Sequence, residues 1–79
     1  MQYFLYILKS VSHNRYYIGQ TSNLQERLKR HNRGDNKSTK PYTPWKLIYS
    51  ESFHSRAEAV KRESFLKSPS GWIELQNII

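Results

Sequence analysis

Two tyrosines, Tyr6 and Tyr17, are the first side chains whose type and spacing could support chemistry. Each lies in a short β-prone segment, and the polar residues between the segments predict an antiparallel hairpin that pairs Lys9 with Asn14. Opposed residues share a face of a sheet, so this register places Tyr6 opposite Tyr17, and a slip of two residues keeps them on one side. Two neighbouring phenols could transfer protons. A cross-strand aromatic pair that only stabilises the hairpin explains the same spacing, and the spacing alone favours that explanation.

A second pair, Arg27 and His31, lies four residues apart on a predicted helix, so the two side chains are neighbours on its surface. Both border the apolar stripe formed by Leu24 and Leu28, which places their polar ends near the edge of the sheet. A solvated basic helix is the plainer explanation of such residues. That explanation fits Lys29, Arg30 and Arg33 better than it fits Arg27 and His31.

Glu63 is the carboxylate with the most unusual predicted environment. At 100° per residue, Ala59, Val60 and Leu66 all lie within about 60° of it on the second predicted helix. A carboxylate in such an apolar arc is unfavourable unless it meets a cation, a hydrogen-bond donor or a metal ion. A buried ion pair with Arg27 or Arg62 and a functional role are therefore both open.

The charge of the chain indicates an anionic partner. Its 79 residues hold 13 Lys and Arg against 6 Asp and Glu, a formal net charge of +7. Residues 27–40 contain a single acid, Asp35, among six cations: Arg27, Lys29, Arg30, Arg33, Lys37 and Lys40. This distribution favours a nucleic-acid partner, because backbone phosphates attract clustered Lys and Arg.

The composition also excludes several classes of protein. There are no cysteines, so disulfide scaffolds, thiolate metal sites and cysteine nucleophiles are excluded. No apolar run is long enough to span a membrane, and no secretory signal is visible. The three histidines lack zinc-ligand spacing, and the three glycines form no phosphate-binding loop. We therefore expect a cytoplasmic protein with no membrane partner and no small-molecule cofactor.

The elements that must position these residues alternate in type along the chain. Strands are predicted at residues 3–8, 15–20 and 45–50, with Trp45, Leu47 and Tyr49 on one face of the last. The first helix is predicted at residues 23–33 with Ser22 as its N-cap, and residues 34–44 form a loop without regular structure. The second helix begins at Ser55 and ends at about Lys67, and a short third helix covers residues 72–79. This order predicts an α+β fold in one domain, residues 1–79: a small three-stranded antiparallel sheet flanked by two to three helices.

The order of these residues resembles the GIY-YIG nuclease superfamily. Leu5-Tyr6-Ile7 is followed, after nine residues, by Tyr17-Ile18-Gly19 and then by Arg27, His31 and Glu63. The segments around these positions also match the small standalone bacterial GIY-YIG proteins, sometimes named for the nuclease subunit of excision repair: Tyr16–Thr21, Asn23-Leu24, His31–Gly34, Lys37–Thr39, Pro44–Tyr49 and Ala59–Glu63. The first motif is Leu-Tyr-Ile here, where the superfamily has Gly-Ile-Tyr, but it keeps one tyrosine.

The resemblance implies a metal-dependent endonuclease that hydrolyses phosphodiester bonds of DNA, structured or single-stranded, with little sequence specificity. It implies that Glu63 holds one divalent metal, Mg²⁺ or Mn²⁺, and that Arg27 contacts the phosphate beside His31. Tyr6 or Tyr17 would be the general base, with its pKa lowered by nearby positive charge. The nucleic-acid backbone would be held by Arg30, Arg33, Lys37, Ser38, Thr39 and Lys40.

Two other functions are compatible with the same charge. A nucleic-acid-binding domain without catalysis needs the basic residues but not Tyr6, Tyr17, Arg27 and Glu63 together. A protein-interaction module with a basic surface predicts no effect of metal and a weak dependence on salt. A single small active centre is compatible with a monomer or a weak dimer.

Overall fold

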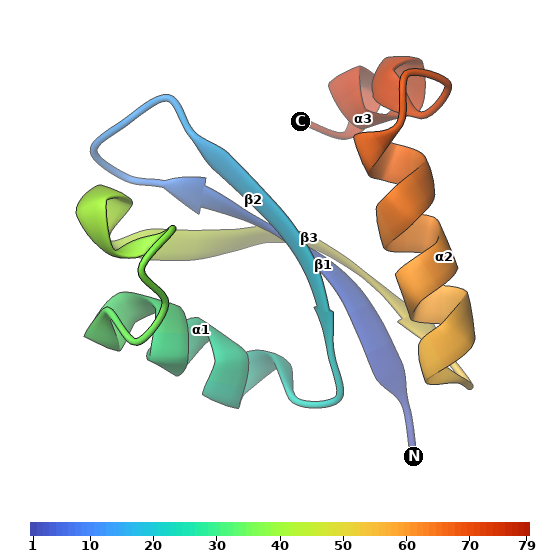
Figure 1. The fold of residues 1–79 in the computed structure, drawn as a ribbon, viewed down its shortest axis with the longest axis horizontal. Coiled ribbons are helices and arrows are strands. Elements are labelled where there is room, and N and C mark those ends of the chain that lie inside the picture. The colour runs from blue at the N-terminus through green and yellow to red at the C-terminus, as the bar shows by residue number, and fades with distance from the viewer.

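The computed structural model describes residues 1–79 and arranges three strands and three α-helices around one sheet (Figure 1). In chain order the elements are β1 (Tyr3–Ser10), β2 (Tyr16–Thr21), α1 (Leu24–Arg33), the 3₁₀ turn η1 (Lys40–Tyr42), β3 (Trp45–Phe53), α2 (Arg56–Lys67) and α3 (Trp72–Ile78). The sheet is antiparallel with strand order β2-β1-β3. The α+β prediction is therefore confirmed. None of the helices is both long and apolar enough to cross a membrane.

The central strand β1 is apolar on both of its faces because helices cover both sides of the sheet. Leu5, Tyr6, Ile7 and Leu8 are each at most 1% exposed. Leu5 and Ile7 pack with Leu66 of α2 and Leu75 of α3, whereas Tyr6 and Leu8 pack on the other face against Trp45, α1 and η1. Figure 1 shows the edge strand β2 passing between α1 on one side and α2 on the other. Tyr6 and α2 thus belong to opposite layers that meet at the β2 edge.

The hairpin register differs from the predicted one by two residues. Lys9 pairs with Tyr16 rather than with Asn14, so Tyr6 faces Gly19 and Leu8 faces Tyr17. The longer turn arises because Ser10 anchors it: its hydroxyl donates to the Tyr42 carbonyl and accepts from the His13 amide. Tyr6 and Tyr17 nevertheless share a face, as a two-residue slip preserves side-chain direction.

In β3 the prediction that Trp45, Leu47 and Tyr49 share one face is wrong. Leu8 pairs with Leu47 while Ile7 pairs with Tyr49, which leaves Ile48 as an extra residue in a bulge. A bulge reverses the alternation of side chains beyond it. Trp45 therefore packs in the layer of Tyr6, and Tyr49 packs in the opposite layer.

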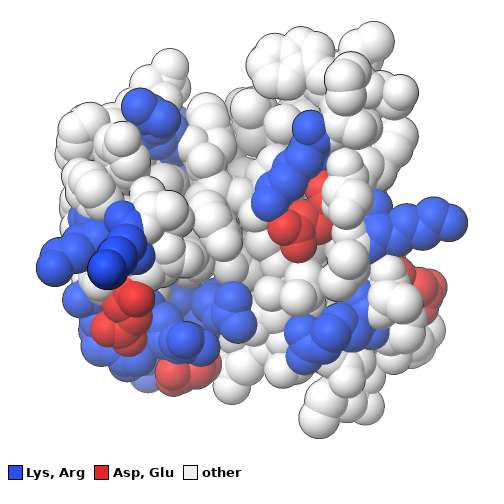
Figure 2. Space-filling view, viewed as in Figure 1, with Lys and Arg blue, Asp and Glu red and all other residues white.

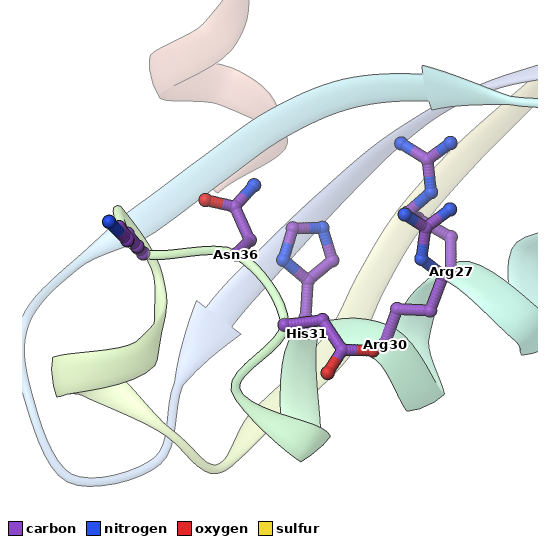
Figure 3. Close-up of a pocket in the computed structure, with 6 residues that line it drawn as sticks. Arg27, Arg30, His31 and Asn36 are labelled. Atoms are coloured by element: carbon purple, nitrogen blue, oxygen red, sulfur yellow. The ribbon is translucent and has the colours of Figure 1, made fainter.

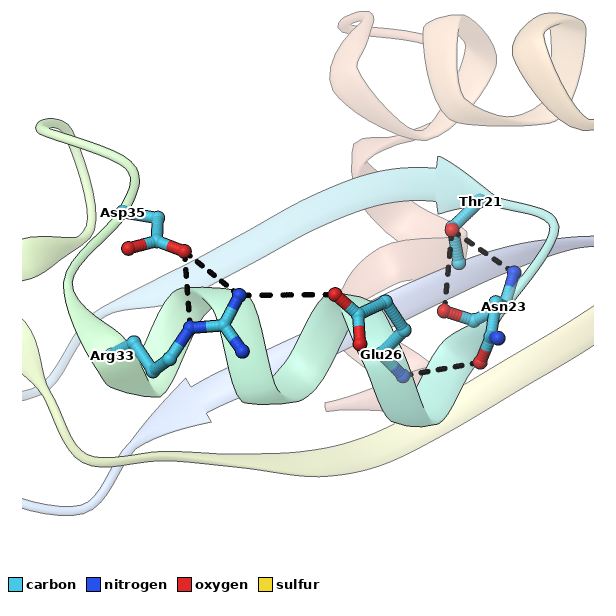
Figure 4. A network of polar contacts seen from close by, with 5 residues as sticks. All are labelled: Thr21, Asn23, Glu26, Arg33 and Asp35. Carbon is cyan, nitrogen blue, oxygen red and sulfur yellow. Dashed lines mark hydrogen bonds and ion pairs between the residues drawn. The ribbon is translucent and has the colours of Figure 1, made fainter.

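The helix termini follow local capping chemistry. The N-cap of α1 is Asn23, one residue later than predicted, because its side-chain oxygen accepts from the Glu26 amide at 3.1 Å while Thr21 bonds the Asn23 backbone (Figure 4). Gly34 ends α1 in the left-handed region at φ 81°. The predicted cap of α2 is confirmed, since the Ser55 hydroxyl accepts from the Glu58 amide at 3.2 Å. The loop after α1 contains one turn of 3₁₀ helix, η1, which the sequence analysis missed.

Candidate active site

Tyr6 and Tyr17 lie side by side on the α1 face of the sheet, with ring centroids 6.1 Å apart. Their exposure differs. Tyr6 is 1% exposed, whereas Tyr17 is only partly buried. Tyr17 also lies against His31, with ring centroids 4.7 Å apart. Of the two phenols, Tyr17 is therefore the one that solvent or a substrate can reach.

His31 connects Tyr6 to the loop after α1. The ring is 1% exposed and uses both nitrogens: Nε2 lies 3.1 Å from the Tyr6 hydroxyl, and Nδ1 lies 2.9 Å from the Thr39 hydroxyl. Helical spacing places His31 on the apolar side of α1, where it would be unfavourable without such partners. Burial lowers the pKa of His31, and the positive charges of Arg27 and Arg30 lower it further.

Burial raises the pKa of Tyr6 to about 12, and the neighbouring Tyr17 raises it as well. Arg27 acts in the opposite direction on the Tyr6 pKa, through its charge and a side-chain hydrogen bond, but burial outweighs it. Arg27 thus acts on the Tyr6 pKa in the expected direction, but the net pKa is raised rather than lowered. The desolvation of a buried phenolate explains the difference, because it disfavours the charged form.

Arg27 and Arg30 open onto a polar pocket of about 290 Å³ at the end of α1. Figure 3 shows Arg27, Arg30 and His31 on α1 and Asn36 on the following loop around this opening, which Lys37 and Asp35 complete. Arg27 is half-buried and Arg30 is exposed. Neither arginine forms an ion pair within the chain, so both charges are available to an anion.

The cations predicted to hold a nucleic acid separate into two groups. Arg30, Lys37 and Lys40 are exposed and have no acidic partner, whereas Arg33 forms ion pairs with Asp35 at 2.9 Å and Glu26 at 3.8 Å (Figure 4). Lys and Arg gather over α1 and the loop after it, and a strip with little charge separates them from the charged side chains of α2 (Figure 2). Uncompensated cations are therefore concentrated over α1 and the loop after it, although Arg56 and Lys61 of α2 also have no ion pair.

Two neighbouring hydroxyl residues, Ser38 and Thr39, have different positions. Ser38 is exposed, although both its amide and its hydroxyl bond the Asn36 side chain. Thr39 is 2% exposed and bonds His31, so the prediction that it holds the nucleic-acid backbone is wrong. Its side chain points inward because η1 turns the chain back over α1, which the sequence analysis did not foresee.

Glu63 is less buried than its place on the helix predicted. Val60, one of its supposed apolar neighbours, is 42% exposed, and the Glu63 side chain is 24% exposed. Its ion-pair partner is Lys67 at 2.7 Å, one turn along α2, rather than Arg27 or Arg62. The charge of Glu63 nevertheless contributes to the raised pKa of Tyr6, although the two residues belong to opposite layers of the fold.

The surroundings of Glu63 fit a hydrated divalent metal and no closed metal site. No cluster of three or more potential ligands exists in the chain. One carboxylate oxygen bonds Lys67 through an exposed i,i+4 pair, and such a pair contributes only about 0.3–0.5 kcal/mol. Mg²⁺ commonly uses one or two carboxylates and completes its shell with water and substrate phosphate. A single accessible carboxylate satisfies that requirement.

A network of two carboxylates around one arginine has a structural role, and the sequence analysis missed it. Glu51 of β3 and Glu74 of α3 both bond Arg62 of α2, and Tyr49 donates to Glu51. The bonds to Arg62 lower the pKa of Glu74 and favour the charged form of Glu51. No sequence motif predicts this network, because its members come from three separate elements. It fixes α2, and with it the position of Glu63.

Comparison with known proteins agrees with this arrangement. The model of the GIY-YIG catalytic domain matches residues 2–74. A UPF0213 protein of Staphylococcus haemolyticus is 37% identical over 78 residues, which cover 98% of this chain and 94% of that protein. A UPF0213 protein of Halobacterium salinarum is 45% identical over 56 residues, 70% of this chain and 73% of that protein. The solution structure of a UPF0213 protein from Bacillus halodurans superposes with a TM-score of 0.56 at 28% identity, covering 99% of this chain and 85% of that one. With its motifs, its fold and a match over nearly its whole length, this chain belongs to the GIY-YIG catalytic-domain family.

Proposed function

We propose that the protein is a metal-dependent endonuclease that hydrolyses phosphodiester bonds of DNA with little sequence specificity. The observation that carries the proposal is the convergence of unlike groups at the β2 edge. Arg27, which has no ion pair, and the accessible phenol of Tyr17 lie beside the buried Tyr6–His31 pair. The carboxylate of Glu63, on the α2 side of the sheet, lies near enough for its charge to act on Tyr6. Packing alone gives no reason to gather an arginine, two phenols and a carboxylate around one strand.

Arg27 is the phosphate-binding group. Its planar guanidinium can donate two parallel hydrogen bonds to non-bridging oxygens, and it is half-buried at the rim of the pocket. Its charge would stabilise the extra negative charge of the transition state. Arg30 and Lys37 lie on the same pocket and would contact neighbouring phosphates. Contacts of this kind hold the backbone without reading bases, which explains the expected lack of sequence specificity.

Tyr17 is the phenol that meets the attacking water. A general base must come within hydrogen-bond reach of the proton that it removes, and Tyr6 is covered and bonded to His31. Tyr17 is less buried than that pair, and its ring contacts both of their rings. The buried Tyr6–His31 pair therefore positions Tyr17 and Arg27.

Glu63 would hold the divalent metal, Mg²⁺ or Mn²⁺, through its partly exposed carboxylate. When bound, the ion would polarise the phosphate and stabilise the leaving oxygen. Displacing Lys67 from Glu63 opposes metal binding only weakly, because the pair is exposed.

A cleavage assay tests the proposal. The purified protein is incubated with end-labelled single-stranded, duplex and branched DNA and with RNA, each with Mg²⁺, Mn²⁺ or EDTA, beside the Glu63→Gln variant as a control. We expect metal-dependent internal cleavage of DNA that the variant lacks. Binding that weakens by about 0.7–0.9 log units per log unit of salt for each phosphate contact, without any cleavage, would instead identify a non-catalytic nucleic-acid-binding domain.

A further inference from the structure

Thr39 has a buried hydroxyl that the proposed nuclease chemistry does not use. The residue is 2% exposed in the loop after α1. Its Oγ1 lies 2.9 Å from His31 Nδ1 and 3.3 Å from the Asn36 carbonyl oxygen. The chain of contacts therefore runs from Tyr6 through His31 and Thr39 to a backbone carbonyl, and each hydroxyl or N–H in it has one proton to give.

The number of protons available selects one direction of donation along this series of hydrogen bonds. Thr39 donates its only proton to the Asn36 carbonyl, so towards His31 its oxygen must accept. His31 Nδ1 then carries the ring proton, and Nε2 is left with a lone pair. Tyr6 donates its hydroxyl proton to that lone pair, and all three buried donors have an acceptor.

The opposite direction leaves a buried proton without an acceptor. If Thr39 donated to Nδ1, His31 would carry its proton on Nε2 and would donate to the Tyr6 oxygen. Arg27, whose charge also acts on the Tyr6 hydroxyl, can only donate and offers no acceptor. Because His31 is the one side-chain hydrogen-bond partner of Tyr6, the Tyr6 proton would then have no acceptor at 1% exposure. Leaving a buried donor unpaired is unfavourable by about 1–3 kcal/mol.

We infer that Thr39 is a positioning residue that fixes His31 as the neutral Nδ1–H tautomer and so directs the Tyr6 hydroxyl proton to His31 Nε2. The Tyr6 oxygen then keeps its lone pairs free for a donor, and Arg27, which lines the pocket beside His31, is the cation whose charge acts on it. The effect on cleavage rests on the proposed nuclease function, whereas the tautomer is a property of the folded protein.

The first test measures the tautomer directly, without a substrate. Long-range ¹H–¹⁵N correlation spectra of uniformly ¹⁵N-labelled protein distinguish a protonated from an unprotonated ring nitrogen, and His13→Gln and His54→Gln variants assign the signals. We expect Nδ1 protonated and Nε2 unprotonated for His31. Protonation at Nε2 in the wild-type protein would overturn the inference, whether or not the protein is a nuclease.

The second test removes the hydroxyl. Thr39→Val keeps the shape but cannot accept from Nδ1, so we expect a mixed or reversed tautomer, whereas Thr39→Ser retains the wild-type spectrum. Thr43→Val is the matched control, since the Thr43 hydroxyl bonds only the Lys40 carbonyl at 3.2 Å. An unchanged His31 tautomer in Thr39→Val would contradict the inference. If that variant does not fold, the wild-type and Thr39→Ser spectra still decide.

The kinetic consequence separates positioning from binding. In Thr39→Val we expect kcat for DNA cleavage to fall about 10-fold or more, because the transition state requires close alignment of Arg27 and Tyr17. Binding of DNA without metal should change less than twofold, since Thr39 contacts no substrate. Rescue of kcat by Thr39→Ser is expected. A reversed tautomer with unchanged kcat would show that the tautomer has no catalytic consequence, and absence of cleavage in the wild-type protein would reject the nuclease proposal alone.

Discussion

Gly19 and Tyr6, paired across β1 and β2, occupy space that only a residue without a side chain can share. A β-carbon on Gly19 would lie 2.7 Å from the Tyr6 hydroxyl oxygen and 2.8 Å from the ring carbon that bears it. Gly19 does not have a positive φ, so the constraint is steric and not conformational. The glycine of the second motif therefore exists, in this chain, to let the Tyr6 ring lie flat across β2.

Gly19→Ala should displace Tyr6 from His31. We expect cleavage to fall by about 10-fold or more at temperatures where the variant is still fully folded, because the support under Arg27 and Tyr17 moves. Gly34→Ala is the control: its φ of 81° strains any other residue, and its β-carbon would meet the Lys40 side chain at 3.2 Å rather than Tyr6. Circular dichroism melts and cleavage rates of both variants give the comparison. Equal losses of rate at equal stability would show that Gly19 has no special role.

The two tyrosines should respond differently to loss of the hydroxyl. Tyr17→Phe removes the accessible phenol, so we expect loss of cleavage with little change in melting temperature. Tyr6→Phe leaves His31 Nε2 without a partner, so it should lower the free energy of unfolding by about 1–3 kcal/mol. Chemical denaturation beside single-turnover cleavage distinguishes them. An active Tyr17→Phe variant would move the role of base to Tyr6.

Arg27 and Arg30 provide a matched pair on one helix. Arg27→Ala should reduce kcat by about 10²-fold or more, the usual cost of losing a transition-state charge contact. Arg30→Ala should weaken binding and reduce the salt dependence by about one phosphate contact. Binding titrations at several salt concentrations and single-turnover rates separate these effects. If both variants lose kcat equally, the basic face acts as a whole and Arg27 has no distinct role.

Glu63→Gln should abolish metal-dependent cleavage and leave the fold unchanged. The lost ion pair with Lys67 is exposed, so we expect the free energy of unfolding without metal to change by no more than about 0.5 kcal/mol. DNA binding should persist or become tighter, because a negative charge near the phosphates is removed. Glu58→Gln, on the same helix, is the control. Isothermal titration with Mn²⁺ and a cleavage assay provide the measurements, and metal binding by the Glu63→Gln variant equal to wild type would reject the ligand assignment.

Stability should depend on pH through His31. Its pKa is lowered in the folded protein, whereas the unfolded chain titrates near 6.5. Between about pH 6.5 and the folded-state pKa, His31 binds a proton in the unfolded state but not in the folded state. The free energy of unfolding therefore falls as the pH decreases through this range. The lowered pKa of Glu74 acts in a separate window, below its usual value of 4.5. Urea denaturation between pH 8 and pH 5 checks this, and a flat profile there contradicts it.

Much of the fold followed from local patterns, whereas the site depended on contacts that no local pattern encodes. The run from Tyr3 to Leu8 predicted a buried strand, and Ser55 with Glu58 predicted the start of α2; both agree with the structure. The bulge at Ile48 was not predicted, because Trp45, Leu47 and Tyr49 alternate along the sequence as in a regular strand, and only the pairing with β1 shows the extra residue. The environment of Glu63 was misjudged because helical angles show which residues share a face but not which neighbours cover it.

Thr39 is another residue whose environment the local sequence did not predict. A threonine between Ser38 and Lys40 in a polar loop has the composition of a phosphate-binding segment. Only the turn η1, which depends on Trp45 donating to the Thr39 carbonyl at 2.9 Å, directs its hydroxyl inward. That bond joins residues in different elements, so a reading of the chain one segment at a time could not find it.

The edge position of β2 has a consequence for self-association. An edge strand exposes backbone groups that could pair with the edge of another chain, and proteins limit this hazard with short strands and charge. Here β2 has only six residues, and the surface beside it carries uncompensated cations on α1. Two copies that approach through this edge would repel each other, while a polyanion would be drawn to the same place. The exposed edge of β2 can therefore remain accessible to a polyanion while the neighbouring charge limits pairing between two copies of the chain.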